Sequence, residues 1–203
     1  FDSFLSSGII DVYPTTGKRH GAFCSRGSKE IPPYILLNYE ENFENIQTIA
    51  HESGHAINHK FINDNNFGIY RGNSLALAEV ASTFFENLVT EHFMNSNLGE
   101  KEEFSLLMNQ INDQINTIFR QISFYETEIQ FHREFREKYN LSTIELGEIF
   151  KQNLIKYSNN SLILNGDIGN FWIGVPHFRY FFYVYSYASG LLISNALLYS
   201  VKN

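Results

Sequence analysis

The pattern of apolar and polar positions changes near residue 40. Residues 8–38 carry short apolar runs, as in GIIDVYP, GAFCS and PPYILLNY, separated by Gly, Pro and Ser, which is typical of short strands joined by turns. From Asn42 onward, apolar positions recur every three or four residues, as they do on one face of a helix. The pattern predicts two or three strands of a small sheet within residues 1–40 and a helical part over residues 41–203.

The helical part is expected to contain five helices. The first four cover about residues 42–62, 73–95, 100–138 and 142–157, and the last begins near Tyr180. Asn, Ser and Gly between residues 158 and 167 indicate a loop or a short hairpin. The expected fold class is mainly α with a small β-sheet near the N-terminus.

Composition and charge narrow the class of protein. The 203 residues are 43% hydrophobic and 18% charged, as in a globular protein with a real core. A net charge of -7 argues against binding to nucleic acid or to an anionic membrane. Residues 180–201 carry no charge, but their many Tyr and Ser side chains favour a buried helix lining a cleft over a membrane span.

The single cysteine and the two ends of the chain carry weaker signals. Cys24 excludes an internal disulfide and fits a reducing compartment. The first residues lack a basic region followed by an apolar stretch, so a cytoplasmic location is expected. Neither end shows the usual start or stop signals of a helix, so we expect the chain to be a piece of a larger protein.

The segment TIAHESGHAIN carries the chemistry. His51 and His55 are four residues apart and therefore share one face of the predicted helix, where two imidazoles can bind one Zn²⁺. Glu52 points to the side of that pair and can reach a water molecule beside the metal as a general base. The alternative is a surface helix with two solvated histidines.

A catalytic zinc site needs a third protein ligand and an open position for water. Glu79 lies in LALAEVASTFFENL, 24 residues after His55, among apolar neighbours where an unpaired carboxylate would be costly. Glu86, two turns further on, is the alternative ligand. It is better placed to accept a hydrogen bond from a ligand histidine and orient its ring.

These segments resemble the oligoendopeptidase F and thimet oligopeptidase family of zinc peptidases. IAHESGHAINH and LAEVASTFFE match the family's HExGH motif and its E-x-x-S-x-x-x-E helix. The similarity extends to GIIDVYPTTGKRHGAFCS, PYILLNY, RQISFYETE and VPHFRYFFYVYSYASG, and so covers nearly the whole chain. The sequence departs from the family at Asn58, where the family usually has a histidine.

The resemblance implies a zincin-like helical catalytic domain with one Zn²⁺ per chain that hydrolyses internal bonds of short peptides. Family members are about three times longer, and the remainder of the full-length enzyme would close the substrate cleft. In the family, a histidine and tyrosines of the last segment stabilise the charge that develops on the substrate oxygen. The matching residues are His177, Tyr185, Tyr183 and Tyr187. Of these tyrosines, Tyr185 fits the family's Tyr-x-Tyr pattern best. The segment has four tyrosines, including Tyr180, and for at least two of them the alternative is packing in the core or at the surface.

Two other functions stay open. A zinc carboxypeptidase of related fold would need a cation for the substrate's terminal carboxylate, and Arg179 is the only basic residue in the tyrosine segment. A non-catalytic zinc or helical scaffold domain would need four protein ligands. We expect Arg120 and Glu128 to form a buried ion pair or cap. His20, His92 and His132 are not expected to be metal ligands, and Cys24 is not expected to be a nucleophile.

Overall fold

The computed structural model describes residues 4, 6–70, 72, 74–159, 161–164 and 166–202. The chain forms two compact units. The first comprises Phe1–Leu106 and Gly190–Asn203, and the second comprises Leu107–Ser189. Each unit is described by itself below.

The first unit contains the predicted sheet. Its strands are β1 (Ile10–Asp11), β2 (Phe23–Ser25) and β3 (Tyr34–Leu36), in the order β1-β3-β2. β1 runs parallel to β3, and β2 runs antiparallel to it. The apolar side chains of the sheet pack on helix α2, and the buried members of this core are Phe4, Ile9, Ile35, Leu37 and Ala56.

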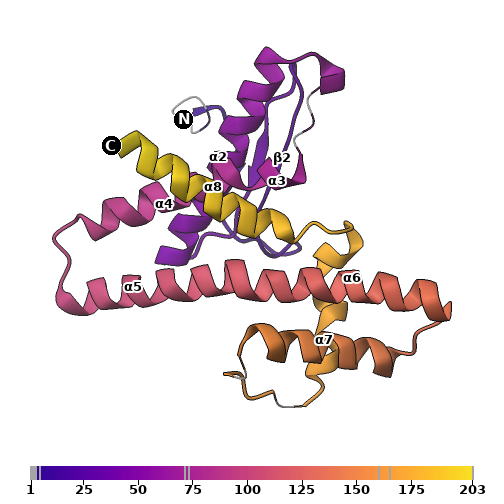
Figure 1. The fold of residues 1–203 in the computed structure, drawn as a ribbon. Coiled ribbons are helices and arrows are strands. Elements are labelled where there is room, and N and C mark those ends of the chain that lie inside the picture. Colours follow the sequence, from indigo (N-terminus) through magenta and orange to yellow (C-terminus); the bar gives the residue numbers. More distant parts are fainter. Residues whose placement is uncertain are drawn as a thin grey trace. The chain divides into compact units, whose positions relative to one another are not determined.

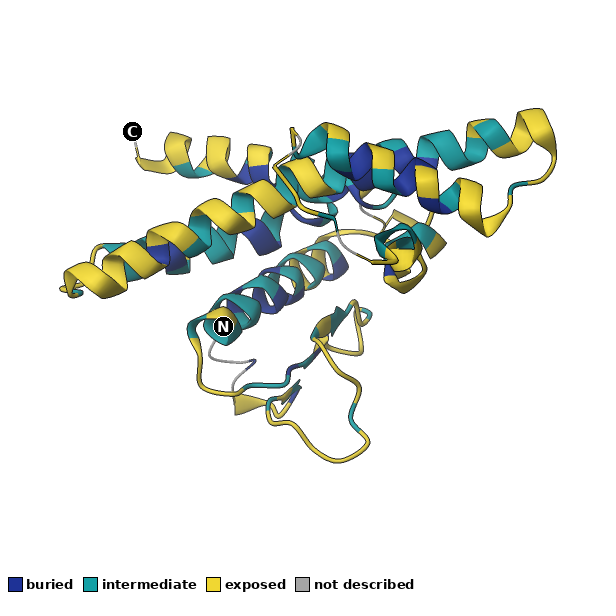
Figure 2. Ribbon diagram, turned by 90° about the horizontal axis from the view of Figure 1, so that it is seen from below, coloured by how far each residue is buried: buried dark blue, intermediate teal, exposed yellow. Residues whose placement is uncertain are grey.

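Helix α2 (Phe43–Asn65) is the first predicted helix. The Asn42 side chain accepts a hydrogen bond from the backbone N–H of Asn45, which caps the start of the helix. In Figure 2 the ribbon of α2 is mostly buried or partly buried, whereas the loops between the strands are largely exposed. The segment that carries His51 and His55 thus lies on a helix that is held in the core.

The second predicted helix is interrupted. It consists of α3 (Leu75–Ala78) and α4 (Val80–Met94), and Glu79 between them has φ -101° and ψ 3°. α4 packs against α2. The second part of α8 (Tyr185–Lys202) lies along α4, where the Asn87 amide donates to the Asn195 side chain at 2.8 Å and Lys202 pairs with Glu91.

The third predicted helix is present over its whole length. It comprises α5 (Glu100–Ile115), a π-helical turn (Asn116–Arg120) and α6 (Gln121–Lys138), which run on as one long helix in Figure 1. α7 (Thr143–Tyr157) packs on α6 and begins with a capping box between Ser142 and Glu145. The buried core of the second unit consists of Phe124, Phe150, Leu154, Val175 and Val184.

Of the loop or short hairpin expected between residues 158 and 167, the described residues form the loop, and two 3-10 helices follow it at Ile168–Gly174 and Pro176–Arg179. One expectation for the segment after α7 is wrong. The last helix begins at Tyr185 and not near Tyr180. The reason is that Phe181 and Phe182 have left-handed backbone angles, with φ of 45° and 55°, which a right-handed helix cannot include.

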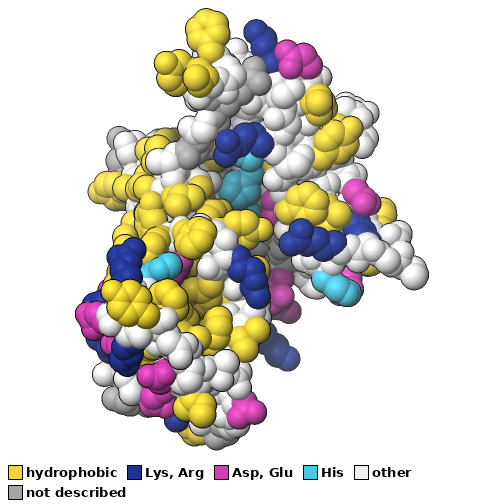
Figure 3. Space-filling view, turned by 90° about the vertical axis from the view of Figure 1, so that its right-hand side faces the viewer, with side chains coloured by type: hydrophobic (Ala, Val, Ile, Leu, Met, Phe, Trp, Pro, Cys, Tyr) yellow, Lys and Arg dark blue, Asp and Glu magenta, His cyan; other side chains and the backbone are white. Residues whose placement is uncertain are grey.

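The fold class is confirmed as mainly α with a small sheet. None of the described helices combines the length and apolar character that crossing a membrane requires. On the face drawn in Figure 3, Lys and Arg side chains lie scattered among hydrophobic and acidic ones.

Candidate metal centre

Three predicted ligands meet at one point in the first unit. The Nε2 atoms of His51 and His55 are 3.1 Å apart, and the Glu79 Oε2 atom lies 3.4 Å from the first and 3.3 Å from the second. The three atoms therefore form a nearly equilateral triangle. In the described part of the chain, this is the group of histidine and carboxylate side chains that could hold a metal ion.

The size of this triangle fits a tetrahedral ion. With bonds of about 2.0–2.1 Å, Zn²⁺ holds its ligand atoms about 3.3–3.4 Å apart. The three measured edges, 3.1, 3.3 and 3.4 Å, agree with this separation. An ion bound by the three atoms would keep a fourth position open.

Glu86 fixes the orientation of His51. Its Oε1 atom lies 2.6 Å from His51 Nδ1, so the Nδ1–H donates to the carboxylate and Nε2 faces Glu79 and His55. Glu86 was the alternative ligand, and the structure puts it on the far side of the His51 ring. This is the orienting position expected from the sequence.

The carboxylates of Glu52, Glu79 and Glu86 stabilise a positive charge at the site. Burial alone would lower the pKa of His51, but the hydrogen bond to Glu86 and the charges of Glu86, Glu79 and Glu52 outweigh it and raise that pKa to about 9. In the metal-free site, a proton on His51 supplies a positive charge among these carboxylates. A bound metal ion would replace that proton.

Glu79 is positioned by its place at the break between α3 and α4. The Ser82 hydroxyl lies 3.0 Å from Glu79 Oε2 and holds the carboxylate from the side of α4. The Thr83 hydroxyl donates to the Glu79 carbonyl oxygen. Glu79 is only 2% exposed, and the backbone of α8 covers it at Gly190, where a Cβ atom would lie 2.7 Å from Glu79 Cβ.

Gly54 brings α2, which carries His51 and His55, close to α4, which begins directly after Glu79. A Cβ atom at this position of α2 would lie 2.7 Å from the Ala81 carbonyl oxygen and 2.8 Å from Ser82 Cα. Both are backbone atoms of α4 and cannot turn aside. The absence of a side chain therefore lets α4 approach close enough for Glu79 to reach the two histidines.

Glu52 lies on α2 beside the triangle and is 7% exposed. Burial raises the pKa of Glu52, and the charges of Glu79 and Glu86 add to this effect, whereas His51 and His55 oppose it. A carboxylate whose pKa is raised toward neutrality is suited to accept a proton and give it up again.

Cys24 and His59 lie near the histidine pair. The His59 ring stacks on that of His55, and its Nδ1 is 3.9 Å from Cys24 Sγ. Burial and the charge of Glu52 raise the pKa of the Cys24 thiol to about 12, so it is not a nucleophile near neutral pH. Cys24 is a residue of strand β2, as expected.

Three of the four predicted residues of the tyrosine segment form a cluster in the second unit. The Tyr187 hydroxyl is 2.8 Å from His177 Nε2, and the Tyr183 ring stacks on the His177 ring at 5.5 Å between centroids. Tyr185 lies elsewhere, because its ring packs on Tyr125 at 5.8 Å. Tyr187 and Tyr183 are therefore better placed than Tyr185 to act together with His177.

The remaining polar residues of this unit have structural partners. The Arg179 guanidinium donates to the carbonyl oxygens of Ile173 and Val175. Glu128 caps the backbone N–H of Phe182 at 2.8 Å, and Arg120 lies over the Phe124 ring at 5.7 Å. Of the two forms expected for Arg120 and Glu128, the cap is the one observed, at Glu128.

Sequence reasoning missed Gly54, Ser82 and Gly190. Gly54 and Ser82 lie within the two motifs, but their roles become visible only when α2 is packed on α4. Gly190 is far from both motifs in the chain, and no local pattern connects it with Glu79.

Comparison with known proteins gives a consistent result. The profile of the family described as Peptidase family M3 matches residues 2–203. Oligopeptidase PepF of Bacillus subtilis is 34% identical over 201 residues, which are 97% of this chain and 30% of that protein. Group B oligopeptidase PepB of Streptococcus agalactiae is 34% identical over 194 residues, or 96% of this chain and 32% of that protein.

The fold is also found among solved structures. A structure of PZ peptidase A with an inhibitor superimposes with a TM-score of 0.76 at 16% identity, over 95% of this chain and 34% of that one. At this identity the likeness concerns the fold alone. The chain thus spans about a third of the length of the proteins that it matches.

Proposed function

Since this chain belongs to peptidase family M3, we propose that it is the catalytic part of a zinc-dependent endopeptidase that cleaves internal bonds of short peptides. The observation that carries the proposal is the triangle of His51 Nε2, His55 Nε2 and Glu79 Oε2, whose edges suit one tetrahedral ion. Two imidazole nitrogens and one carboxylate oxygen form a ligand set that zinc accepts in hydrolytic enzymes.

A bound Zn²⁺ would supply Lewis acidity, which lowers the pKa of water and polarises a carbonyl group. Residues of the protein would transfer the proton and orient the His51 ring. Glu52 accepts the proton of the attacking water at its carboxylate and then delivers it to the leaving nitrogen. Glu86 keeps the His51 ring in the tautomer with the proton on Nδ1.

His177 and the tyrosines would stabilise the negative charge that develops on the substrate oxygen. Hydroxyl and imidazole N–H donors serve this purpose when they are fixed before the reaction begins. The hydrogen bond between Tyr187 and His177, with Tyr183 stacked on the same ring, supports such a fixed arrangement. Tyr185 remains a candidate of lower rank.

The geometry favours this function over the two alternatives. A scaffold zinc site would need a fourth protein ligand, and the group in the described part of the chain has three donors. A carboxypeptidase would need a free cation in the tyrosine segment, but the Arg179 guanidinium already donates to two backbone carbonyl oxygens. Endopeptidase action is therefore the better-supported reaction.

The substrates and the complete cleft extend beyond this chain. Because it spans 30% of the length of the Bacillus subtilis relative, we propose that the remainder of a longer enzyme closes over the peptide. Closure of a cleft positions the substrate and excludes water. We therefore expect the isolated chain to bind zinc but to cleave peptides weakly.

Two measurements test the proposal. Metal analysis of the purified protein should find one zinc per chain, and His55→Ala should lose it. In the intact enzyme, an internally quenched peptide with a blocked carboxy terminus should be cleaved, and Glu52→Gln should slow this cleavage by about 100-fold or more while keeping the zinc. Glu44→Gln, at the start of the same helix and away from the triangle, is the matched control. Near wild-type turnover by Glu52→Gln would refute the role of Glu52 as the base.

A further inference from the structure

The turn that precedes helix α8 has an unusual backbone. Phe181 and Phe182 are consecutive aromatic residues with left-handed φ angles, a conformation that bulky side chains disfavour. Neither glycine nor asparagine is present to ease it. Such a conformation persists only when the surrounding structure holds it, and the turn lies directly before Tyr183 and close to Tyr187.

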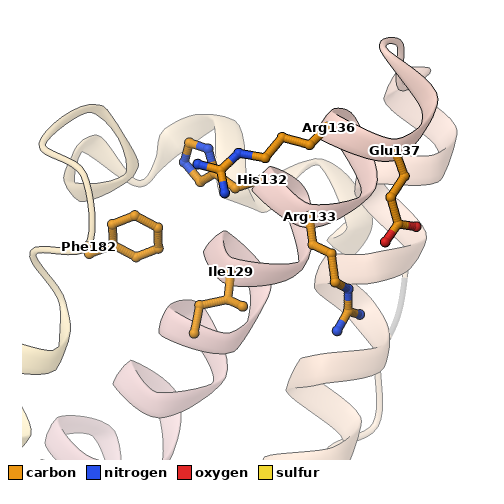
Figure 4. A pocket seen from close by; sticks show the side chains of 6 residues that line it. All are labelled: Ile129, His132, Arg133, Arg136, Glu137 and Phe182. Atoms are coloured by element: carbon orange, nitrogen blue, oxygen red, sulfur yellow. The ribbon is translucent and has the colours of Figure 1, made fainter.

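One face of α6 holds this turn. The Phe182 ring packs against Tyr125 at 6.0 Å and against His132 at 5.2 Å between centroids. Figure 4 shows the Phe182 side chain beside Ile129 and His132, which project from α6. The α6 residues concerned are spaced three, four or seven apart and therefore share a face of the helix.

Glu128 makes the polar contact on that face. The residue is 2% exposed, and its Oε1 atom accepts a hydrogen bond from the backbone N–H of Phe182 at 2.8 Å. Its second oxygen, Oε2, is buried without a hydrogen-bond partner in the described structure. Burying a carboxylate with a single hydrogen bond is costly, so stability alone does not account for a glutamate at this position.

The aromatic side chains of residues 182–187 contact two different groups of residues. Phe182 and Tyr185 pack against Tyr125 of α6, whereas Tyr183 and Tyr187 contact His177. Val184 between them is fully buried in the core of the unit. A change in the backbone at Phe182 would therefore move Tyr183 and the start of α8 together.

We propose that Glu128 is a positioning residue for catalysis, which acts through the Phe182 N–H to hold the turn that sets Tyr183 and Tyr187 against His177. This inference rests on the proposed role of His177 and the two tyrosines. Glu128 itself does not touch the substrate in this mechanism. Its effect should therefore appear in kcat, with little change in KM.

The test uses three variants of Glu128 in the intact enzyme. Glu128→Gln keeps a neutral acceptor for the Phe182 N–H and should stay within about threefold of wild-type kcat. Glu128→Ala removes the acceptor and should lower kcat by about 10- to 100-fold, since misplaced donors to a developing charge cost up to this order. Glu128→Asp is too short by one methylene group and should behave like Glu128→Ala, which keeps the test available if the alanine variant does not fold. Glu137→Ala, on the exposed surface of the same helix, is the control and should leave kcat unchanged.

A crystal structure of the alanine or aspartate variant supplies a readout that needs no activity. The distance from Tyr187 Oη to His177 Nε2 should increase from 2.8 Å to beyond hydrogen-bonding range, and the glutamine variant should keep it. An unchanged distance, or a kcat equal to that of Glu137→Ala, would overturn the proposal. If the distance lengthens but the wild-type enzyme cleaves no peptide, the proposed function fails and the positioning role of Glu128 stands.

Discussion

Gly54→Ala tests the close approach of the two ligand-bearing helices. In an ordinary helix interior this substitution stabilises a protein by about 1 kcal/mol, because alanine has the higher helix propensity. Here the new Cβ atom would lie 2.7 Å from the Ala81 carbonyl oxygen, 2.8 Å from Ser82 Cα and 2.9 Å from the Ala81 carbonyl carbon. All three are backbone atoms of α4, so the helices must move apart.

The required shift can be compared with the tolerance of a metal site. Ordinary van der Waals contact begins near 3.4 Å, so the closest pair must separate by about 0.7 Å. Zinc–ligand distances are held to about 0.2 Å. Glu79 directly precedes α4, so a movement of α4 away from α2 would move Glu79 as well. We therefore expect zinc affinity to fall by at least about tenfold. Overpacking costs about 2 kcal/mol, which outweighs the gain in helix propensity and leaves a net loss of about 1 kcal/mol.

Zinc titration with a competing chelator measures the affinity, and urea unfolding of the metal-free protein measures the stability. Gly147→Ala is the matched control, because a Cβ atom at Gly147 would also meet backbone, 3.1 Å from the Gly169 carbonyl oxygen, but in the other unit. This variant should keep its zinc affinity. Unchanged zinc affinity together with equal or higher stability in Gly54→Ala would refute the reasoning.

Further outcomes concern the residues around the triangle. Glu52→Gln should lower kcat by about 100-fold or more with zinc content unchanged, since general bases contribute effects of this order; steady-state kinetics and metal analysis check this. Glu86→Ala should weaken zinc binding by about 10- to 100-fold, because it removes the group that orients His51; equal affinity in a chelator titration would contradict that role. In the metal-free protein the His51 pKa of about 9 means that the ring is protonated at pH 7.5, so zinc binding should release about one proton. Calorimetry in two buffers of different ionisation enthalpy measures this release, which should decrease as the pH rises through 9. Cys24, with a thiol pKa of about 12, should react with iodoacetamide at pH 8 about a thousandfold more slowly than a thiol of pKa 9.0. Mass spectrometry follows the reaction, and rapid labelling of the folded protein would contradict the raised pKa of this thiol.

The grouping of His51, His55 and Glu79 could be predicted from the sequence because its signals are local. His51 and His55 share a helix face through their spacing alone. Glu79 could be predicted because an acidic residue among alanines, leucine and valine needs a partner, and the expected position matches the triangle.

The conformation around Glu79 could not be predicted in the same way. LALAEVAS consists mostly of the good helix formers Ala, Leu and Glu and contains neither proline nor glycine. The helix nevertheless breaks at Glu79, where Ser82 contacts the carboxylate and Gly190 of α8 covers the side chain. These contacts come from packing between segments that are distant in the chain, so propensity gives no sign of them.

The start of the last helix shows the same limit. Residues 180–184 are aromatic or β-branched, which does not exclude a helix, and the turn lacks glycine and asparagine. The left-handed angles of Phe181 and Phe182 are held by a carboxylate 54 residues away. A pattern that is read along the chain cannot reveal a contact at that separation.

The electrostatics of the centre give an argument for a cation that is independent of the motif. Glu52 and Glu79 are buried beside the two histidines, and Glu86 contacts one of the rings. Placing several carboxylates in a protein interior costs free energy unless a positive charge compensates them. The proton on His51 compensates only one of these charges, whereas a divalent cation at the triangle would compensate two and would free Nε2 from its proton. Because such an ion would bind the folded arrangement and not the unfolded chain, its binding would also stabilise α2 against α4, and the loss of the ion should affect both chemistry and fold.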